Sequence, residues 1–201
     1  MQKTLISIIG STGIGKTKLA IEMAKHFSTE IISCDSRQFF KEMKIGTATP
    51  TDEELAQVKH HFIGHLSVQD YYFIGPYEED ASEKIEEIFE KNDFAVLVGG
   101  SMMYEKAVVE GLNDLPEANA ENQEKLQKIL DEEGLEKLQE ILKNLDEEYY
   151  KGVHKEKPRR LLRAIDVIWQ TGRKYSEIIA EPKHKRDFKV IRIGITAPRE
   201  I

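Results

Sequence analysis

The segment GSTGIGKT, Gly10 to Thr17, carries the strongest chemical signal in the sequence. It has the form G-x-x-x-x-G-K-[ST], which about 1% of chains of this length would contain by chance. Its glycines let backbone amides point inward, and a following helix adds its positive end. A lysine then supplies a cation for the outer phosphate, and a threonine hydroxyl can ligate Mg²⁺. We expect the diphosphate-binding residues to be Gly10, Ser11, Thr12, Gly13, Ile14, Gly15, Lys16 and Thr17.

A loop of this kind usually binds ATP or GTP. Hydrolases and kinases that use it usually carry a second signal, an apolar strand that ends in an aspartate near Mg²⁺. The candidate strand FAVLVGG ends in Gly99 and Gly100, and the other candidate, EIISCDS, has an acid at Asp35 but runs on into RQFF. This pattern argues against phosphoryl transfer, although some small-molecule kinases also lack a tidy second signal.

The elements around the loop predict how it is positioned. TLISIIG reads as a buried strand, and Lys16 to Phe27 reads as the helix that follows it. Further strands are expected at EIISCDS, HHFIGHL, FAVLVGG and VIRIGI, with a short helix at 51–60 and an amphipathic helix from Ala81 to Lys91. Strands that alternate with helices predict an α/β fold, a P-loop NTPase-like parallel sheet.

The pattern changes between residues 116 and 189, which contain no convincing strand. They predict helices from Gln123 to Asn144, with an interruption near Gly134, from Pro158 to Gln170, and from Ser176 onward. We therefore expect a P-loop core at 1–115, an all-helical inserted domain at 116–189, and a return strand of the core at 190–201.

Composition sets the broad class. With 40% hydrophobic and 32% charged residues, the 201-residue chain reads as soluble and globular. No apolar stretch approaches the roughly 20 residues of a membrane helix, and the N-terminal apolar run is too short for a signal peptide. Cys34 is the single cysteine, so no disulfide can form within the chain. We expect a cytoplasmic protein with no membrane partner, and a monomer.

Charge is distributed unevenly along the chain. The net charge of −7 argues against a nucleic-acid partner, but residues 151–189 carry 12 basic and 5 acidic residues, whereas 51–150 carry 8 and 26. A local basic block is what a polyanion would contact. The same block could also be a solvated helix face.

Five motifs occur in order and at natural spacing, namely GSTGIGKT, SCDSRQFFKEMKIGTATP, HHFIGHL, VGGSMMYEKAVVEGL and KPRRLLRAIDVIWQTGR. Together they resemble the tRNA dimethylallyltransferases, also called tRNA isopentenyltransferases. The resemblance implies that the loop holds the diphosphate of dimethylallyl diphosphate, with Mg²⁺ at Thr17. It also implies transfer of the dimethylallyl group to the exocyclic amine of the adenine next to the anticodon, so the partner would be a tRNA anticodon stem-loop.

The resemblance also assigns site residues. It makes Asp35 the base that takes the amine proton, with Lys16 and Thr17 stabilising the leaving group. The tRNA contacts that it implies are Asp35, Ser36, Arg37, Gln38, Ser101, Arg159, Arg160, Leu161, Leu162 and Arg163. Read without the resemblance, Asp35 could be a strand-end cap or a Mg²⁺ partner, and the arginines could be solvated or salt-bridged.

The chain departs from the family pattern at several positions. It has Arg159 where the family commonly has Gln, Gly64 where Asp is frequent, Ser101 where Thr is usual, and Gln123 where Arg is usual. Family members also continue beyond "APREI", so the sequence resembles a form shortened at its C-terminus. Three alternatives stay open: an adenylate isopentenyltransferase acting on free nucleotides, a P-loop small-molecule kinase, and a non-catalytic RNA-binding module.

Three other features have simple interpretations. His60, His61 and His65 lie close together in sequence, but without a second ligand cluster they read as structural or cleft-lining residues rather than as a metal site. Trp169 is expected in the core of its helix with Ile165 and Ile168. Cys34 is expected to pack beneath the sheet edge.

Overall fold

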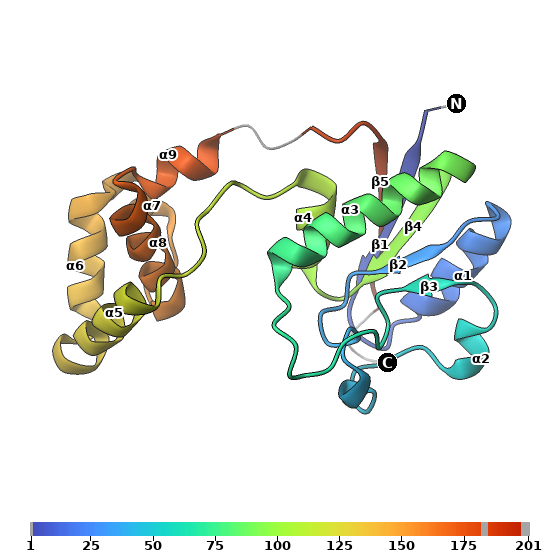
Figure 1. Ribbon diagram of the computed structural model, residues 1–201, viewed down its shortest axis with the longest axis horizontal. Helices are drawn as coiled ribbons and strands as arrows, with labels where there is room; N and C mark the ends of the chain where they lie inside the picture. The colour runs from blue at the N-terminus through green and yellow to red at the C-terminus, as the bar shows by residue number, and fades with distance from the viewer. Residues whose placement is uncertain (1, 182–184, 198–201) are drawn as a thin grey trace. The chain divides into compact units, whose positions relative to one another are not determined.

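The computed structural model describes residues 2–181 and 185–197. The chain forms two compact units, one made of Met1–Leu112 with His184–Ile201 and one made of Asn113–Lys183 (Figure 1). The helical unit therefore has bounds close to, but not identical with, the 116–189 that the sequence suggested. Each unit has its own apolar core.

The first unit contains a five-stranded parallel sheet in the order β3-β2-β4-β1-β5 (Figure 1). Its strands are β1 (Thr4–Gly10), β2 (Ile31–Ser33), β3 (His60–His61), β4 (Phe94–Gly99) and β5 (Lys189–Ile195). The α/β fold with a parallel sheet is thus confirmed. The strand expected at HHFIGHL is much shorter, because only its two histidines pair with β2.

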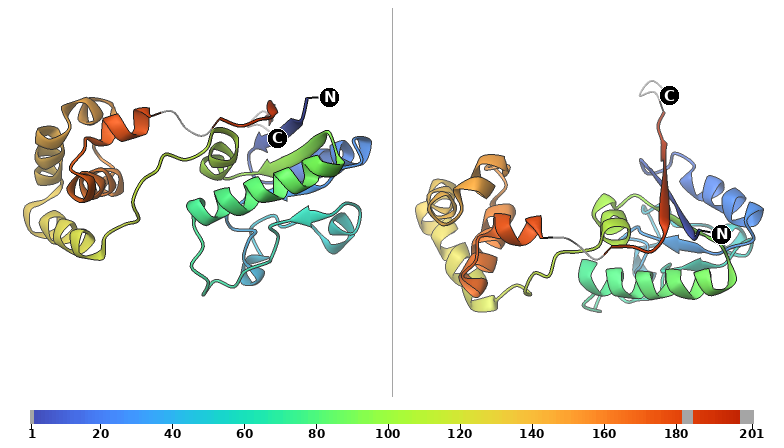
Figure 2. Two further views of the ribbon diagram at one scale, coloured as in Figure 1. Left: turned by 45° about the horizontal axis from the view of Figure 1, so that its top comes forward. Right: turned by 90° about the horizontal axis from the view of Figure 1, so that it is seen from above.

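Helices cover both faces of this sheet (Figure 2). Helix α1 (Lys16–His26) packs Ala20 and Ala24 against alternate side chains of β1 and β4. The other face meets α3 (Ile74–Lys91) and α4 (Met102–Glu110). Short elements η1 (Lys41–Met43) and α2 (Asp52–Leu55) complete the unit. The central strands are mostly apolar because both of their faces are covered, with Ser7 of β1 as a buried polar exception.

Two helices differ from the sequence-based expectation. Helix α3 begins at Ile74 rather than Ala81, because Pro76 lies in its first turn, where a proline removes no helical hydrogen bond. Helix α4 follows the end of β4 and was not expected. A buried carboxylate on α4, Glu105, accepts hydrogen bonds from Ser7 of β1 (2.8 Å) and Arg192 of β5 (2.9 Å), and so ties these elements together.

The second unit is helical throughout its described residues, 113–181. Its helices are α5 (Ala120–Glu133), α6 (Leu135–Leu145), α7 (Glu147–Gly152), α8 (Pro158–Thr171) and α9 (Tyr175–Ala180). Gly134 separates α5 from α6 at a φ of 85°, as expected. Helix α7 was not expected. The core lies between α5, α6 and α8.

Two single-residue expectations had different outcomes. Cys34 is fully buried, as expected. The expectation for Trp169 is wrong, because 39% of its surface is exposed in the last turn of α8, beside exposed Gln170. No helix in the described ranges is long and apolar enough to span a membrane.

Candidate active site

The phosphate-binding loop connects β1 to α1 and lines the main pocket of the first unit. Gly15, the residue before α1, has a φ of 95°, a conformation that favours glycine and turns the chain into the helix. Of the eight predicted loop residues, those that line the pocket are Thr12, Gly13, Gly15, Lys16 and Thr17. The loop backbone and the first turn of α1 thus face one cavity, as an anion site requires.

Lys16 is folded back onto its own loop. Its ammonium donates a hydrogen bond to the Ser11 carbonyl at 2.7 Å. Partial burial lowers the pKa of Lys16, while the negative charge of nearby Asp35 opposes that shift. An incoming phosphate would therefore offer a partly desolvated ammonium a better partner than a neutral carbonyl.

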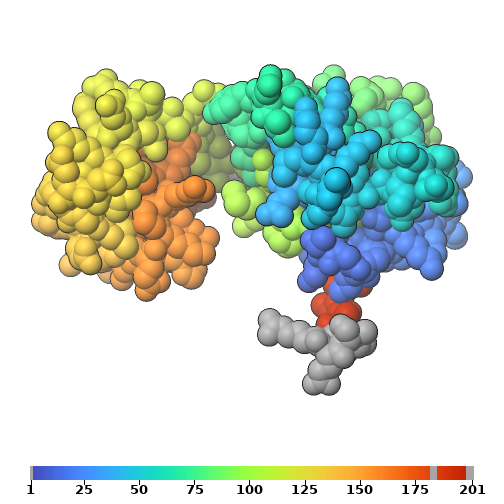
Figure 3. Space-filling model, turned by 90° about the horizontal axis from the view of Figure 1, so that it is seen from below, coloured from blue at the N-terminus to red at the C-terminus, as the bar shows by residue number. Residues whose placement is uncertain are grey.

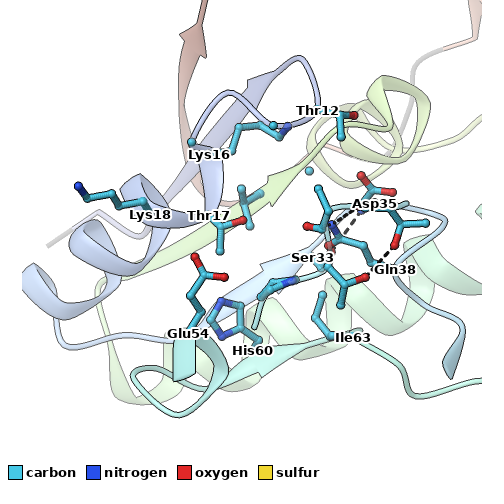
Figure 4. Close-up of a pocket in the computed structure, with 18 residues that line it drawn as sticks. Thr12, Lys16, Thr17, Lys18, Ser33, Asp35, Gln38, Glu54, His60 and Ile63 are labelled. Carbon is cyan, nitrogen blue, oxygen red and sulfur yellow. Dashed lines mark hydrogen bonds between the residues drawn. The ribbon is translucent and has the colours of Figure 1, made fainter. Parts of the chain in front are cut away.

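Asp35 lies just beyond the end of β2, at the carboxyl edge of the sheet. Pairing with β4 continues past the last strand residue, because the Cys34 amide donates to the Val98 carbonyl at 2.8 Å. One Asp35 oxygen, Oδ1, accepts from the Arg37 amide at 3.2 Å. The other lies beside Gly100, where a Cβ would come within 3.2 Å of it. Figure 4 shows Asp35 with Ser33 and Gln38 on one side of the pocket, and Lys16 with Thr12 on the other.

The predicted acceptor-side residues are brought together only in part. Ser101, just before α4, lies next to Ser36, with the two hydroxyls 3.1 Å apart and the Ser36 amide also 3.1 Å from Ser101 Oγ. Arg37 is exposed. The Gln38 amide nitrogen is already committed, because it donates to the Thr47 and Ala48 carbonyls at 3.1 and 3.0 Å. Gln38 therefore braces the neighbouring loop.

The wall opposite the phosphate loop was largely missed from the sequence. The pocket has a volume of about 260 Å³, and its further lining residues include Thr47, Thr49, Pro50, Glu54, His60 and Ile63 (Figure 4). His60 Nδ1 bonds the Val58 carbonyl at 2.8 Å. Its Nε2 is buried and has no partner among the described residues, and burial lowers the pKa of this imidazole. The sequence allows either a structural or a cleft-lining role for His60, and its place in the pocket lining supports the second.

The predicted tRNA residues of the helical unit fall into two groups. Arg159 and Arg160 are exposed in the first turn of α8. Leu161 and Leu162 are 0% and 8% exposed in the helical core, so their contact with RNA stays a prediction that their side-chain burial does not favour.

Arg163 is held within the helical unit rather than projecting freely. It bonds the buried Asp166 at 3.2 Å and the Pro116 carbonyl at 2.5 Å. Asp166 also accepts from Asn122 and Gln170, each at 3.0 Å. This network orders the segment that enters the unit, so its first role is structural.

The donor groups of the pocket suit Mg²⁺ that is shared with a substrate. Among the described residues, no group of three or more acidic, histidine or cysteine side chains is arranged to hold a metal ion. Mg²⁺ does not require one, because it keeps several waters and takes oxygens from substrate phosphates. The Thr17 hydroxyl lines the same pocket as Ser33 and Asp35, which is the type of donor set that such a shared ion uses.

Comparison with known proteins gives a uniform result. Residues 38–201 match the family model described as IPP transferase. The chain is 50% identical over its full length to a tRNA dimethylallyltransferase of Christiangramia forsetii, of which it covers 67%. It is 46% identical to the one from Flavobacterium psychrophilum, with 98% of this chain and 66% of the relative covered. The chain thus spans about two thirds of the length of these curated relatives.

Solved structures agree with the sequence relatives. A eukaryotic dimethylallyltransferase, described as acting on tRNA, superposes with a TM-score of 0.80 at 26% identity, over 96% of this chain and 48% of that one. The full-length tRNA isopentenylpyrophosphate transferase of Bacillus halodurans gives 0.61 at 29% identity, over 99% and 62%. By its family model and its relatives, the chain belongs to the IPP transferase family.

Proposed function

We propose that the chain transfers the dimethylallyl group of dimethylallyl diphosphate to the exocyclic amine of the adenine next to a tRNA anticodon, and releases diphosphate. One observation carries the proposal. A phosphate-binding loop and a carboxylate on the neighbouring strand end, Asp35, line one pocket, while β4 ends in Gly99 and Gly100 with no acid for a nucleotide-bound metal. The names of the relatives support the same reaction.

The leaving-group side follows from the phosphate loop. As the bond between the allylic carbon and the diphosphate oxygen breaks, negative charge builds on the diphosphate. The loop residues, the start of α1 and Lys16 line the same pocket, so the loop amides and the Lys16 ammonium would stabilise that charge. Mg²⁺ held by the Thr17 hydroxyl would add positive charge beside the same oxygens.

The acceptor side needs a base. The adenine amine is a weak nucleophile because its lone pair is delocalised into the ring, and it must lose a proton as the new carbon–nitrogen bond forms. Asp35 lies across the pocket from the phosphate loop, so its carboxylate can accept that proton (Figure 4). The carboxylate would then return the proton to solvent, which balances the reaction.

The acceptor is assigned to RNA on charge and accessibility. The target base must leave its stack to reach Asp35. Ser36 and exposed Arg37 follow Asp35 directly, and Ser101 lies beside Ser36. Arg159 and Arg160 are exposed cations of the helical unit. We further propose that the protein acts as a cytoplasmic monomer on the anticodon stem-loop.

A transfer assay tests the proposal. The chain would be incubated with labelled dimethylallyl diphosphate and Mg²⁺, with unmodified tRNA, AMP or no acceptor in parallel. We expect label in tRNA alone. Label in AMP alone would favour a nucleotide-level transferase, ATP-dependent phosphoryl transfer without tRNA would favour a kinase, and tRNA binding without turnover would favour a binding module.

The base assignment has its own test. Asp35→Asn keeps the size of the side chain and removes its basicity. It should lower single-turnover transfer by about 10²- to 10⁴-fold, with tRNA affinity retained. Near-normal turnover would reject Asp35 as the base. Asp114→Asn, at an exposed acid of the other unit, is the matched control.

A further inference from the structure

An isolated apolar side chain stands at the rim of the pocket. We define the rim loop as residues 41–49. It includes η1 and ends at Thr49. Within it Ile45 is 97% exposed, more than any other large hydrophobic residue described. Covering an isoleucine side chain gains about 1.5–3 kcal/mol, so this side chain provides a driving force for association that the described structure leaves unused.

Hydrogen bonds close the rim-loop backbone on both sides of Ile45. Thr47 Oγ1 donates to the Met43 carbonyl at 2.6 Å and lies 2.8 Å from the Thr49 hydroxyl. The Gln38 side-chain amide donates to the carbonyls of Thr47 and Ala48. A backbone that is already ordered loses little conformational entropy when a partner covers the side chain it carries.

The loop stands directly at the candidate active site. Thr47, Ala48 and Thr49 line the same pocket as Asp35. The side chain of Gln38 braces the loop. Its backbone N–H donates to the Asp35 carbonyl at 3.0 Å, which closes one turn between the two residues. In Figure 3 the rim loop belongs to the sky-blue segment on the face shown. Ile45 therefore lies two residues from the wall of the pocket that would receive an extruded base.

The charge around Ile45 is positive. Lys41 and Lys44 are exposed, and neither forms an ion pair within 4.0 Å in the part of the chain that the structure describes. The one acid in the loop, Glu42, is turned elsewhere, because its oxygens accept from the Ser67 hydroxyl at 2.8 Å and the Val68 amide at 3.1 Å. Two exposed cations close in sequence to an exposed apolar tip suit a polyanion with apolar rings.

A hollow next to the loop limits where the phosphates can lie. Lys41 and Lys44 line it together with Asp52 and Glu53 of α2. The two carboxylates would repel an RNA backbone. Phosphate contacts are therefore expected at the two lysines, of which Lys44 directly precedes Ile45.

We propose that the rim loop is an RNA-binding wedge, in which Ile45 packs against a nucleobase beside the extruded adenine and Lys41 and Lys44 contact the adjoining phosphates. The inference rests on the proposed function. Extruding one base leaves its neighbours with an unstacked face, and apolar side chains are known to fill such gaps in nucleic acids. The partner is a single-stranded RNA loop, rather than a protein or a lipid surface.

The main test compares two exposed apolar residues. Ile45→Ser should leave thermal unfolding unchanged, because the side chain is 97% exposed. It should weaken binding of an anticodon stem-loop RNA by about 10-fold, the loss expected for one apolar contact. Val68→Ser, at a residue 54% exposed and outside the pocket lining, should have no effect. Equal affinity of Ile45→Ser and the wild-type chain would overturn the proposal.

Two further measurements identify the contact. An RNA with 2-aminopurine beside the target adenine should change its emission on binding the wild-type chain, and that change should be smaller with Ile45→Ser. Lys44→Gln should lower the slope of log affinity against log salt by about 0.7, the value for one single-strand phosphate contact. An unchanged slope, or a loss of binding to anionic vesicles instead of RNA, would contradict an RNA wedge.

The inference and the proposed function can fail separately. The inference is wrong and the function stands if Asp35→Asn abolishes transfer while Ile45→Ser transfers to tRNA normally. If Ile45→Ser lowers single-turnover transfer at saturating tRNA while tRNA affinity is unchanged, the loop acts on the pocket and not on RNA binding, which also overturns the wedge.

Discussion

Gly99, the last residue of β4, allows β4 to approach the backbone of Cys34 and Asp35 at the end of β2. A Cβ at this position would lie 2.6 Å from the Cys34 carbonyl carbon and 2.8 Å from the Asp35 amide nitrogen. Both atoms belong to the backbone, so no side-chain rotation can relieve the contact. Gly99→Ala should therefore push the end of β2 away from β4 and move Asp35 with it.

The size of the effect follows from these distances. Ordinary contact with a Cβ begins at 3.4 Å, so the backbone must move by about 0.8 Å. Overpacking of this kind costs about 1–3 kcal/mol of stability. A displacement near 1 Å at a reacting group can cost about 10²-fold in rate. We expect Gly99→Ala to be folded but less stable, and to transfer the dimethylallyl group roughly 100-fold more slowly.

The assay is single-turnover transfer to tRNA, with chemical denaturation measured in parallel. Gly194→Ala is the matched control, because it changes a strand glycine of β5 whose Cβ would meet nothing within 4 Å. It should leave the rate and the stability close to those of the wild-type chain. Normal transfer by Gly99→Ala, or an equal loss in Gly194→Ala, would refute the reasoning that close strand contact positions Asp35.

The remaining predictions concern the helical unit and His60. Arg163→Ala should destabilise that unit by about 2–3 kcal/mol in denaturation experiments, because it leaves the buried Asp166 without its cation. Its salt dependence of tRNA binding should match that of the wild-type chain, whereas Arg160→Ala should reduce the salt slope by about 0.7–0.9 if that exposed guanidinium contacts a phosphate. His60 has a pKa lowered by burial, so the unfolded chain binds more protons between the folded pKa and about 6.5, and stability should fall as pH drops through that window. His60→Gln should flatten this decline in denaturation measured from pH 7.5 to pH 5, and an equally steep decline in the variant would contradict the assignment.

The phosphate-binding half of the pocket could be predicted because it is local in sequence. Gly10 to Thr17 form one continuous segment between a strand and a helix, and both elements follow from the apolar pattern. The position of Asp35 could also be predicted, since an acid that follows an apolar strand must lie at the carboxyl edge of a parallel sheet.

The opposite wall could not be predicted, because its residues are not local in sequence to the phosphate loop. Glu54, His60 and Ile63 reach the pocket because a two-residue strand, β3, pairs with β2. So short a strand has no periodicity to detect. In α8 the resemblance marked a whole segment as contacting RNA and could not separate its residues. Helical geometry separates them, because it turns Leu161 and Leu162 into the core while Arg159 and Arg160 stay exposed.

The position of the acid separates this pocket from that of a nucleotide hydrolase. An aspartate at the end of β4 would lie between β2 and β1, next to the phosphate loop that follows β1. Here that place is taken by Gly99 and Gly100, and a Cβ on Gly100 would already come within 3.2 Å of Asp35 Oδ2 and 3.9 Å of Thr12 Oγ1. The space between the loop and Asp35 is therefore kept free of side chains. In the proposed reaction the acid at the end of β2 serves the acceptor amine, so a loop suited to phosphates can serve a reaction in which the phosphates leave and carbon is transferred.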